Sequence, residues 1–414
     1  MPVHGARRSS PGSGAPKAWS RSIELRWPRV PDSDGTSVLL AVEQLRRTVP
    51  GGIGAYARGL LTGLTKVGRD VDGIELTLLA SRAPGVVPAN RRDAVDPLVQ
   101  WDRPLRLSSL PGPLMTRAWD LGLLRAPEGF DVVHSVTTAA PMAARSGHAR
   151  RVVTVHDLAW RRYPDATTRR GRRWHEQSLR RAIRSGASIV VPSRLVAADV
   201  MESGVAAERL TVAGGGTDHL AEPDLEATQV LLRHVGVNGE YLLTVSTLEP
   251  RKNLDRLVQA YAVVRSALPS PWPLVVVGPE GWGGKPSQPS GAGVVFTGRV
   301  SDAALAGLYA SARAFAYVPL TEGYGLPPLE AMRMGTPTAV AREVPSVHDL
   351  DGPQRVPARL VDPLDVDDIA AGLLEVLTDD ELRSDLTGRG GTYARERTWR
   401  ATAEAHVQLW RSLQ

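Results

Sequence analysis

The sequence has no cysteine among its 414 residues, and none of its uninterrupted apolar runs is long enough to cross a lipid bilayer. The first absence excludes disulfide bonds and thiolate ligands for a metal ion, and the second argues against an integral membrane protein. The nine histidines form no H-E-x-x-H pair, and no acidic cluster resembles a divalent-cation site. We therefore predict neither a metal nor a cofactor, and a cytoplasmic location, with which a chain lacking cysteine is compatible.

The chain is long enough for two domains, and its 42% hydrophobic and 23% charged residues are typical of a globular protein. Residues 1–34 are rich in Arg, Ser, Pro and Gly and lack the apolar segment of a secretory signal. We interpret them as a disordered tail.

Arginine is concentrated between Arg145 and Arg184, although the formal net charge is only +6. Such a segment can bind phosphates of a lipid, a substrate or a nucleic acid, and it can equally be a solvated helix face. It does not match a nucleic-acid-binding motif, so no nucleic-acid partner is expected. Peripheral contact with an anionic membrane, at its inner face, is compatible with this patch and with the Trp-containing segment 101–119.

Short apolar runs alternate with amphipathic stretches along the chain, which predicts parallel sheets covered by helices on both faces. The predicted strands are 37–45, 74–81, 131–136, 152–155, 188–192 and 209–213, and, in the second half, 241–246, 274–278, 294–296, 314–318 and 337–341. We predict an α/β protein of two doubly wound, Rossmann-like domains, 35–222 and 223–397, facing a central cleft. A final helix, 398–414, is predicted to pack back on the first domain, with Trp399 and Trp410 as anchors.

The most informative stretch reads LTEGYGLPPLEAM and contains Glu322 and Glu330. The two prolines favour a helix that begins there, with Glu322 in the preceding loop and Glu330 in the opening turn. Gly323 and Gly325 let a ligand approach peptide N–H groups at the helix N-terminus, where an anion is stabilised. The alternative is that Glu330 complements the helix dipole and Glu322 is a solvated carboxylate.

A second cluster, TLEPRKN, follows the predicted strand 241–246 and opens an amphipathic helix. Its Arg251 and Lys252 stand at the carboxyl end of a strand, where a sheet of this kind presents its ligand. Two adjacent cations can hold a pyrophosphate and neutralise the charge that grows on it when a bond to it breaks.

The Glu322-x7-Glu330 pattern, with GYGLPPLEAM and EPRKN, resembles glycosyltransferase family 4, the retaining transferases of GT-B fold, from residue 37 to the carboxyl end. The resemblance implies a nucleotide-sugar donor whose diphosphate binds Arg251 and Lys252. Glu330 would bind the ribose hydroxyls, and Glu322 would hold hydroxyls of the transferred sugar. The run LPPLEAM is similar to many mannosyltransferases, which makes GDP-mannose the predicted donor.

The resemblance extends to weaker motifs that would surround the donor. Gly52 and Gly54 lie in a glycine-rich stretch before the first helix; their spacing also fits a dinucleotide-binding turn, but it begins too far after the strand. His156 would lie beside the donor sugar, or it is a hydrogen-bonded structural residue. The remaining predicted donor contacts are the loop residues Gly323, Tyr324, Gly325 and Leu326, and the base-contacting turn Gly298, Arg299 and Val300. For that turn, the alternative is an ordinary connection between a strand and a helix capped by Ser301.

The acceptor is less defined, because the first domain carries the weakest motifs. Ser193 and Arg194 follow a strand in a family-like VVPSR sequence, with Arg194 facing the acceptor and Ser193 as a helix cap. The segment GGGTDH departs from the family's usual N-G-V-D form, so Asp218 receives no role. We predict an unidentified hydroxyl acceptor, compatible with a lipid-linked one. The alternatives are an epimerase or phosphorylase of the same fold, or a protein that binds nucleotide sugars without turning them over.

Overall fold

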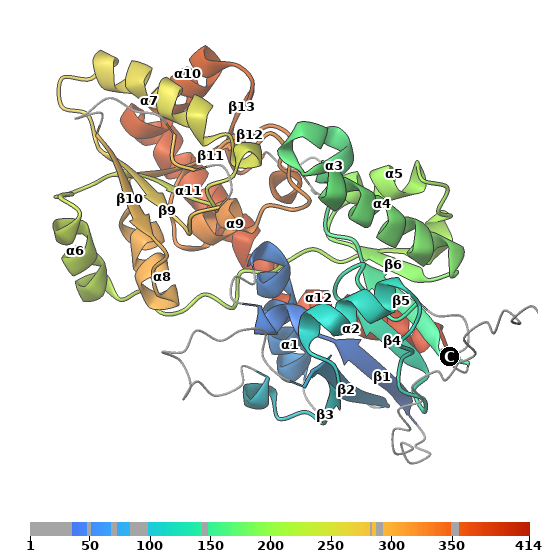
Figure 1. Cartoon of the computed structure of the whole chain (residues 1–414). Coiled ribbons are helices and arrows are strands. Elements are labelled where there is room, and N and C mark those ends of the chain that lie inside the picture. The colour runs from blue at the N-terminus through green and yellow to red at the C-terminus, as the bar shows by residue number, and fades with distance from the viewer. Residues whose placement is uncertain are drawn as a thin grey trace, which may run out of the picture.

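A computed structural model describes residues 35–47, 51–67, 73–82, 98–142, 148–281, 284–286, 293–348 and 356–414. The predicted tail and Arg145 lie outside these residues. Figure 1 shows two α/β domains that meet along their inner sides. Among the described residues, no helix combines the length and apolar character that crossing a membrane requires.

The first domain is built on a seven-stranded parallel sheet of order β3-β2-β1-β4-β5-β6-β7. Its strands are β1 (Thr36–Ala41), β2 (Ile74–Ser81), β3 (Leu105–Ser108), β4 (Val132–Ser135), β5 (Arg150–Thr154), β6 (Ser188–Val191) and β7 (Leu210–Val212). Its helices are α1 (Gly51–Val67), α2 (Gly112–Asp120), α3 (Ala159–Arg162), α4 (Arg169–Arg184) and α5 (Arg194–Met201).

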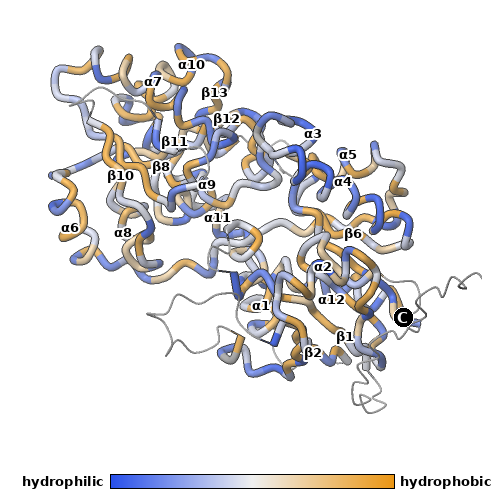
Figure 2. Tube along the Cα trace, viewed as in Figure 1, coloured by the Kyte–Doolittle hydropathy of each residue, from blue (hydrophilic) through white to orange (hydrophobic). Residues whose placement is uncertain are grey.

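Both faces of this sheet are covered, which explains why most residues of its central strands are apolar. Val38 and Leu40 pack on α1, whereas Leu39 on the opposite face packs on Met115 of α2. Figure 2 shows the apolar strands between more polar helices.

The second domain is built on a six-stranded parallel sheet of order β10-β9-β8-β11-β12-β13. Its strands are β8 (Leu242–Val245), β9 (Leu274–Val277), β10 (Val294–Gly298), β11 (Ala314–Tyr317), β12 (Thr338–Ala341) and β13 (Arg359–Val361). Its helices are α6 (Leu225–His234), α7 (Leu254–Ala267), α8 (Asp302–Ser311), α9 (Leu326–Arg333), α10 (Val366–Thr378) and α11 (Asp380–Glu396). The predicted fold class, two Rossmann-like domains, is confirmed.

The last helix, α12 (Trp399–Ser412), returns to the first domain. Its Val407 and Trp410 belong to the apolar cluster of α1 and β1, and Trp399 and Trp410 are fully buried. The chain crosses between the domains twice, and the crossings lie side by side: Thr217 N donates to Arg397 O over 3.0 Å. The Thr217 hydroxyl also donates to Ala394 O over 2.8 Å.

Three details of the predicted elements are corrected. The first strand ends at Ala41 because residues Glu43–Arg46 form a 3-10 turn. Gly52 and Gly54 lie inside the first turn of α1 and not in a loop before it. The strands β3 and β13 at the sheet edges were not predicted, because runs of four and three residues give too short an alternation to detect.

Two histidines are buried where α12 docks on the first domain. His406 of α12 stacks on His134 of β4 with ring centroids 5.3 Å apart, and Trp410 Nε1 donates to His134 Nδ1 over 3.2 Å. Burial, the largest influence, lowers the pKa of His406 to about 4 and the pKa of His134 well below its usual value. The folded protein therefore binds these protons more weakly than the unfolded chain does.

Stability contributed by these neutral histidines is fully present above about pH 6.5 and decreases as the pH falls towards about 4. We expect the Tm to fall by several degrees between about pH 7 and pH 4.5, and to fall less in His406→Gln. Scanning calorimetry of the two proteins measures the difference. His148→Gln, at an exposed histidine, should keep the wild-type slope; an equally steep fall in His406→Gln would contradict this account.

Candidate active site

The candidate site lies at the carboxyl ends of two neighbouring strands of the second sheet, β8 and β11. Chain segments that leave these ends are adjacent, so residues near 250 and near 320 meet despite their separation in sequence. Leu320 N donates to Arg251 O over 2.9 Å and fixes the two segments to each other.

Arg251 and Lys252 lie in the 3-10 turn Pro250–Lys252, before α7 and not in its first turn as predicted. Asn253 separates turn from helix with a left-handed backbone, φ 60°. Its side-chain amide donates to Val318 O and Pro363 O over 2.9 and 2.7 Å. The buried Asn253 thus fixes the cationic turn against the segment that follows β11.

Both cations converge on Glu322. Lys252 Nζ is 2.5 Å from Glu322 Oε1, Arg251 Nη1 is 3.2 Å from Oε2, and the Tyr317 hydroxyl donates to Oε1 over 2.9 Å. Arg251 also donates to Glu249 Oε1 over 2.8 Å and to Thr321 O over 3.1 Å. The side chains of Arg251, Lys252 and Glu322 are all largely buried.

This arrangement favours the ionised forms of Glu322 and Arg251. Burial alone would raise the pKa of Glu322, but the charges of Arg251 and Lys252 outweigh it and lower the pKa to about 2. Burial opposes the charge of Arg251 as well, yet Glu322, Asp157 and Glu249 raise its pKa. Because Glu322, Glu249 and Thr321 hold Arg251 and Lys252 in place, stabilising an incoming anion would require little reorganisation.

The loop between Glu322 and α9 touches the first domain. A Cβ at Gly323 would lie 1.7 Å from His156 O, closer than any side chain tolerates. The Ser193 hydroxyl, which caps α5, donates to Gly323 O over 2.7 Å, and the Tyr324 hydroxyl donates to Gly215 O over 3.1 Å. Gly323 is therefore required by the close contact between the domains.

Gly325 precedes α9 with φ 96°, a backbone conformation that favours glycine. The helix begins at Leu326, so the Leu326 N–H lies beside the Glu322 loop, whereas the next two residues, Pro327 and Pro328, have no N–H. Glu330 is reached only in the second turn, one turn later than predicted.

His156 follows β5, and its backbone carbonyl oxygen takes part in the contact between the domains at Gly323. Its Nε2 is 2.8 Å from Val136 O, and its ring meets the Tyr56 ring edge-on with centroids 5.0 Å apart. Burial lowers the pKa of His156 and so favours a neutral ring. The hydrogen bond to Val136 matches the structural alternative, and a position beside the donor sugar stays a prediction.

Glu330 is buried in a second cluster. The Tyr309 hydroxyl donates to its Oε2 over 2.9 Å, and His219 Nε2 lies 3.5 Å from its Oε1. The structure thus brings Arg251, Lys252 and Glu322 into direct contact. Glu330 is held separately, in α9, four residues after the helix begins.

The other predicted donor contacts have local structural roles. Gly298 ends β10 with φ 70° beside a register shift, Arg299 is exposed, and Val300 is partly buried. The Ser301 hydroxyl accepts from Ala304 N, so the capped connection is observed. Their contact with a nucleobase, like that of Gly52 and Gly54 with a donor, stays a prediction.

Sequence reasoning missed Tyr309, Tyr317 and His219. The two tyrosines lie within a helix and a strand, where an aromatic residue is interpreted as core. His219 follows a run of glycines that we could not assign. Among the described residues, no group of three or more His, Asp and Glu could hold a metal ion.

Two family models match the chain: residues 50–219 match Glycosyltransferase Family 4, and residues 235–392 match Glycosyl transferases group 1. Together with the fold, they define a two-domain glycosyltransferase of GT-B type. The chain is 30% identical over 273 residues to O-antigen chain mannosyltransferase B of Escherichia coli, covering 64% of this chain and 71% of that relative. The chain belongs to glycosyltransferase family 4.

A second relative is the MMP alpha-(1->4)-mannosyltransferase of Mycolicibacterium hassiacum, 27% identical over 372 residues, with 80% of this chain and 87% of the relative covered. Among solved structures, HepE of Anabaena in complex with UDP-glucose has a similar fold, with a TM-score of 0.65. It is 18% identical, and the match covers 91% of this chain and 99% of HepE.

Gly323→Ala tests the contact between the domains. The added methyl group clashes with His156 O and must separate the Glu322 loop from the first domain. We expect glycosyltransferase activity to fall at least about tenfold, because a small displacement disrupts the alignment of the reacting groups. The variant should remain folded, and its radius of gyration in solution scattering should increase. Gly388→Ala, in α11 where a Cβ has open space, is the matched control. Unchanged activity in Gly323→Ala would show that the contact is not needed.

Proposed function

We propose that the protein is a retaining hexosyltransferase that moves mannose from GDP-mannose to a hydroxyl acceptor in glycan or glycolipid synthesis. The observation that carries this proposal is the convergence of Arg251 and Lys252 on Glu322, beside the start of α9. The mannosyltransferase names of the two relatives support mannose as the sugar. HepE, a protein of the same fold, was solved with UDP-glucose, which supports a nucleotide-sugar donor.

The donor diphosphate would bind Arg251, Lys252 and the Leu326 N–H at the start of α9. Lys252 and Arg251 already neutralise Glu322, so a sugar hydroxyl that donates to Glu322 would find a carboxylate that stays ionised. Glu330, in the next turn, would accept from the ribose hydroxyls. The charged groups would thus match the phosphate, sugar and ribose parts of one ligand.

The reaction would break the bond between the anomeric carbon and the leaving diphosphate oxygen. The acceptor hydroxyl oxygen would bond to the same face of that carbon, and its proton would pass to the departing diphosphate. Double displacement would need a carboxylate nucleophile, and Glu322 is the candidate. Its Oε1 accepts from Lys252 and Tyr317, and its Oε2 forms an ion pair with Arg251, which reduces the nucleophilicity of both oxygens and favours the same-face route.

We propose that no metal ion takes part. Arg251 and Lys252 would supply the two positive charges with which a divalent cation otherwise neutralises a diphosphate. A chelator should therefore leave turnover unchanged.

Arg251→Ala removes one of these charges. We expect kcat/KM for the nucleotide sugar to fall on the order of 100-fold or more, because one of the two cations that stabilise the charge on the leaving diphosphate is then missing. Arg251→Lys, which keeps the charge and the balance with Glu322, should recover part of the loss. Arg233→Ala, at an exposed arginine of α6, is the control. Near-normal turnover by Arg251→Ala, measured by nucleotide release, would overturn the phosphate assignment.

Donor and reaction class are tested together. Among UDP-, GDP- and dTDP-sugars, GDP-mannose should give the largest rise in Tm, because only a ligand that prefers the folded state stabilises it. Turnover without an acceptor would indicate an epimerase, turnover with free phosphate a phosphorylase, and binding without turnover a silent binding protein.

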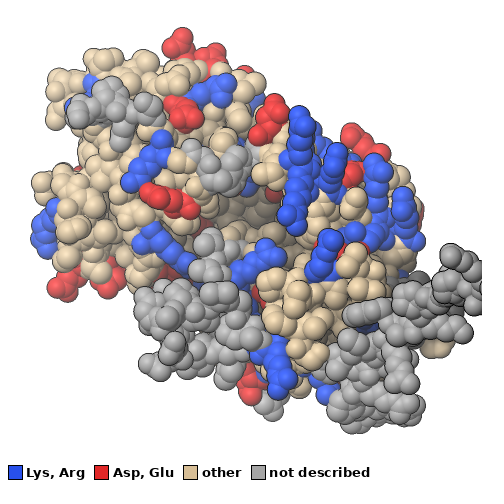
Figure 3. Space-filling view, viewed as in Figure 1, with Lys and Arg blue, Asp and Glu red and all other residues tan. Residues whose placement is uncertain are grey.

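We also propose that the acceptor is lipid-linked and that the first domain rests on an anionic membrane surface. Leu114, Leu121 and Leu123, in and after α2, are 58%, 54% and 70% exposed. The end of α2 adjoins the arginine-rich α4, since Trp174 Nε1 and Arg181 Nη2 donate to Asp120 over 2.6 and 2.5 Å. Figure 3 shows Lys and Arg gathered over α3, α4 and α5 beside the hollow between the domains. Protruding apolar residues next to cations fit an anionic bilayer.

Replacing Leu121 and Leu123 by Ser should reduce binding to vesicles of phosphatidylglycerol and phosphatidylcholine several-fold, because the apolar contribution is lost. Binding of the wild type should weaken with added salt and disappear on pure phosphatidylcholine. Sedimentation of vesicles measures both. Ser at Leu225 and Val230, exposed apolar residues of the second domain, is the matched control. Equal binding of wild type to neutral and anionic vesicles would contradict the proposal and favour a solvated helix face.

A further inference from the structure

The segment GGGTDH, which departs from the usual family form, lies wedged between α9 and α12. A Cβ at Gly215 would lie 2.6 Å from Leu326 Cδ2, and one at Gly216 would lie 2.2 Å from Trp399 N. The glycines are therefore required by packing, and they place the two residues that follow Thr217 beside the first residue of α12.

Asp218 fixes this position. Trp399 N donates to Asp218 Oδ1 over 2.6 Å, and Lys66 of α1 donates to Asp218 Oδ2 over 2.8 Å. The segment is thus held to the first domain one residue before His219.

His219 connects Trp399 to the second domain. Trp399 Nε1 donates to His219 Nδ1 over 2.9 Å. An indole N–H can only donate, so Nδ1 is the acceptor and the ring hydrogen of a neutral His219 is on Nε2. That atom lies 3.5 Å from Glu330 Oε1, while Tyr309 occupies Oε2. A donor therefore faces each oxygen of the buried carboxylate.

We propose that His219 is a positioning residue that orients Glu330 for the vicinal hydroxyls of the donor's ribose, and that Trp399 fixes the tautomer which does so. The inference rests on the proposed role of Glu330 in binding ribose. A carboxylate held from two sides presents its remaining lone pairs in fixed directions, which is what two neighbouring hydroxyl donors require. Because Trp399 is packed against α1, ribose recognition would depend on the docking of α12 on the first domain.

The test compares ligands that differ only in the ribose hydroxyls. Dissociation constants of GDP, UDP and their 2′,3′-dideoxy counterparts are measured by calorimetry with the full chain. The wild type should prefer the ribose form of its nucleotide on the order of 10-fold or more, the effect of a hydrogen bond to a charged group. In Glu330→Gln this preference should be largely lost.

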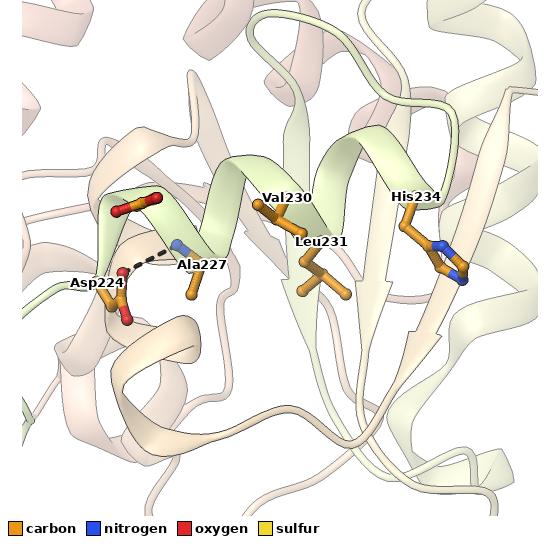
Figure 4. Close-up of a pocket in the computed structure, with 6 residues that line it drawn as sticks. Asp224, Ala227, Val230, Leu231 and His234 are labelled. Atoms are coloured by element: carbon orange, nitrogen blue, oxygen red, sulfur yellow. Dashed lines mark hydrogen bonds between the residues drawn. The ribbon is translucent and has the colours of Figure 1, made fainter.

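His219→Ala should reduce the ribose preference several-fold and leave the affinity for the dideoxy ligand within about twofold, because phosphate and base contacts are untouched. His219→Gln, which keeps an acceptor and a donor, should recover part of the preference. Trp399→Phe removes the indole N–H that donates to His219, together with part of the buried ring, and should lower the ribose preference as His219→Ala does. The matched control is His234→Ala, at an exposed histidine beside an open pocket along α6 (Figure 4).

The outcomes distinguish the proposed role of Glu330 from the proposed role of His219. If Glu330→Gln keeps the ribose preference, the proposed role of Glu330 is wrong and the inference falls with it. If Glu330→Gln loses the preference but His219→Ala keeps it, the proposed function stands and the positioning role of His219 is overturned. A His219→Ala protein that loses affinity equally for ribose and dideoxy ligands shows general damage to the site, which also overturns that role; Tm values identify any variant that fails to fold.

Discussion

The burial of two positive charges at the strand ends of the second domain is the constraint on which the rest of the site depends. Arg251 and Lys252 cannot be buried there without a counter-charge, and Glu322 supplies it from the segment after β11. Holding these charges together requires Asn253 to fix the turn and the glycines to bring the Glu322 loop against His156. The same electrostatic requirement therefore shapes the turn, the loop and the contact between the domains.

The sequence predicted most of the fold because buried parallel strands are continuous apolar runs with helical periodicity between them. Long runs such as Ile74–Ser81 were placed with exact bounds. The errors occur where this signal is short or ambiguous. The apolar pattern of β1 continues into the 3-10 turn after Ala41, and the edge strands β3 and β13 are too short to show alternation. Partners across the interface depend on three-dimensional packing, which a local pattern cannot reveal.

Within the site, the charged residues were predictable and their supporting contacts were not. Arg251, Lys252 and Glu322 follow strand ends and carry recognisable motifs, and the structure brings them together. Tyr317 and Tyr309 contact the two glutamates from elements that give no sign of polar function. The contact of His219 with Glu330 depends on Trp399, 180 residues later, because the indole N–H of Trp399 holds the His219 ring. A motif of neighbouring residues cannot predict contacts between residues so far apart in the sequence.

The paired crossings between the domains have a mechanical consequence. Two chain segments joined by the Thr217 hydrogen bonds to Arg397 and Ala394 would bend together as one hinge between the domains. A single segment would allow the domains to swivel freely, whereas a double one resists torsion and leaves bending about one line as the compliant motion. Opening to release a product would then follow a fixed arc, and the domains would return to the same register after every cycle.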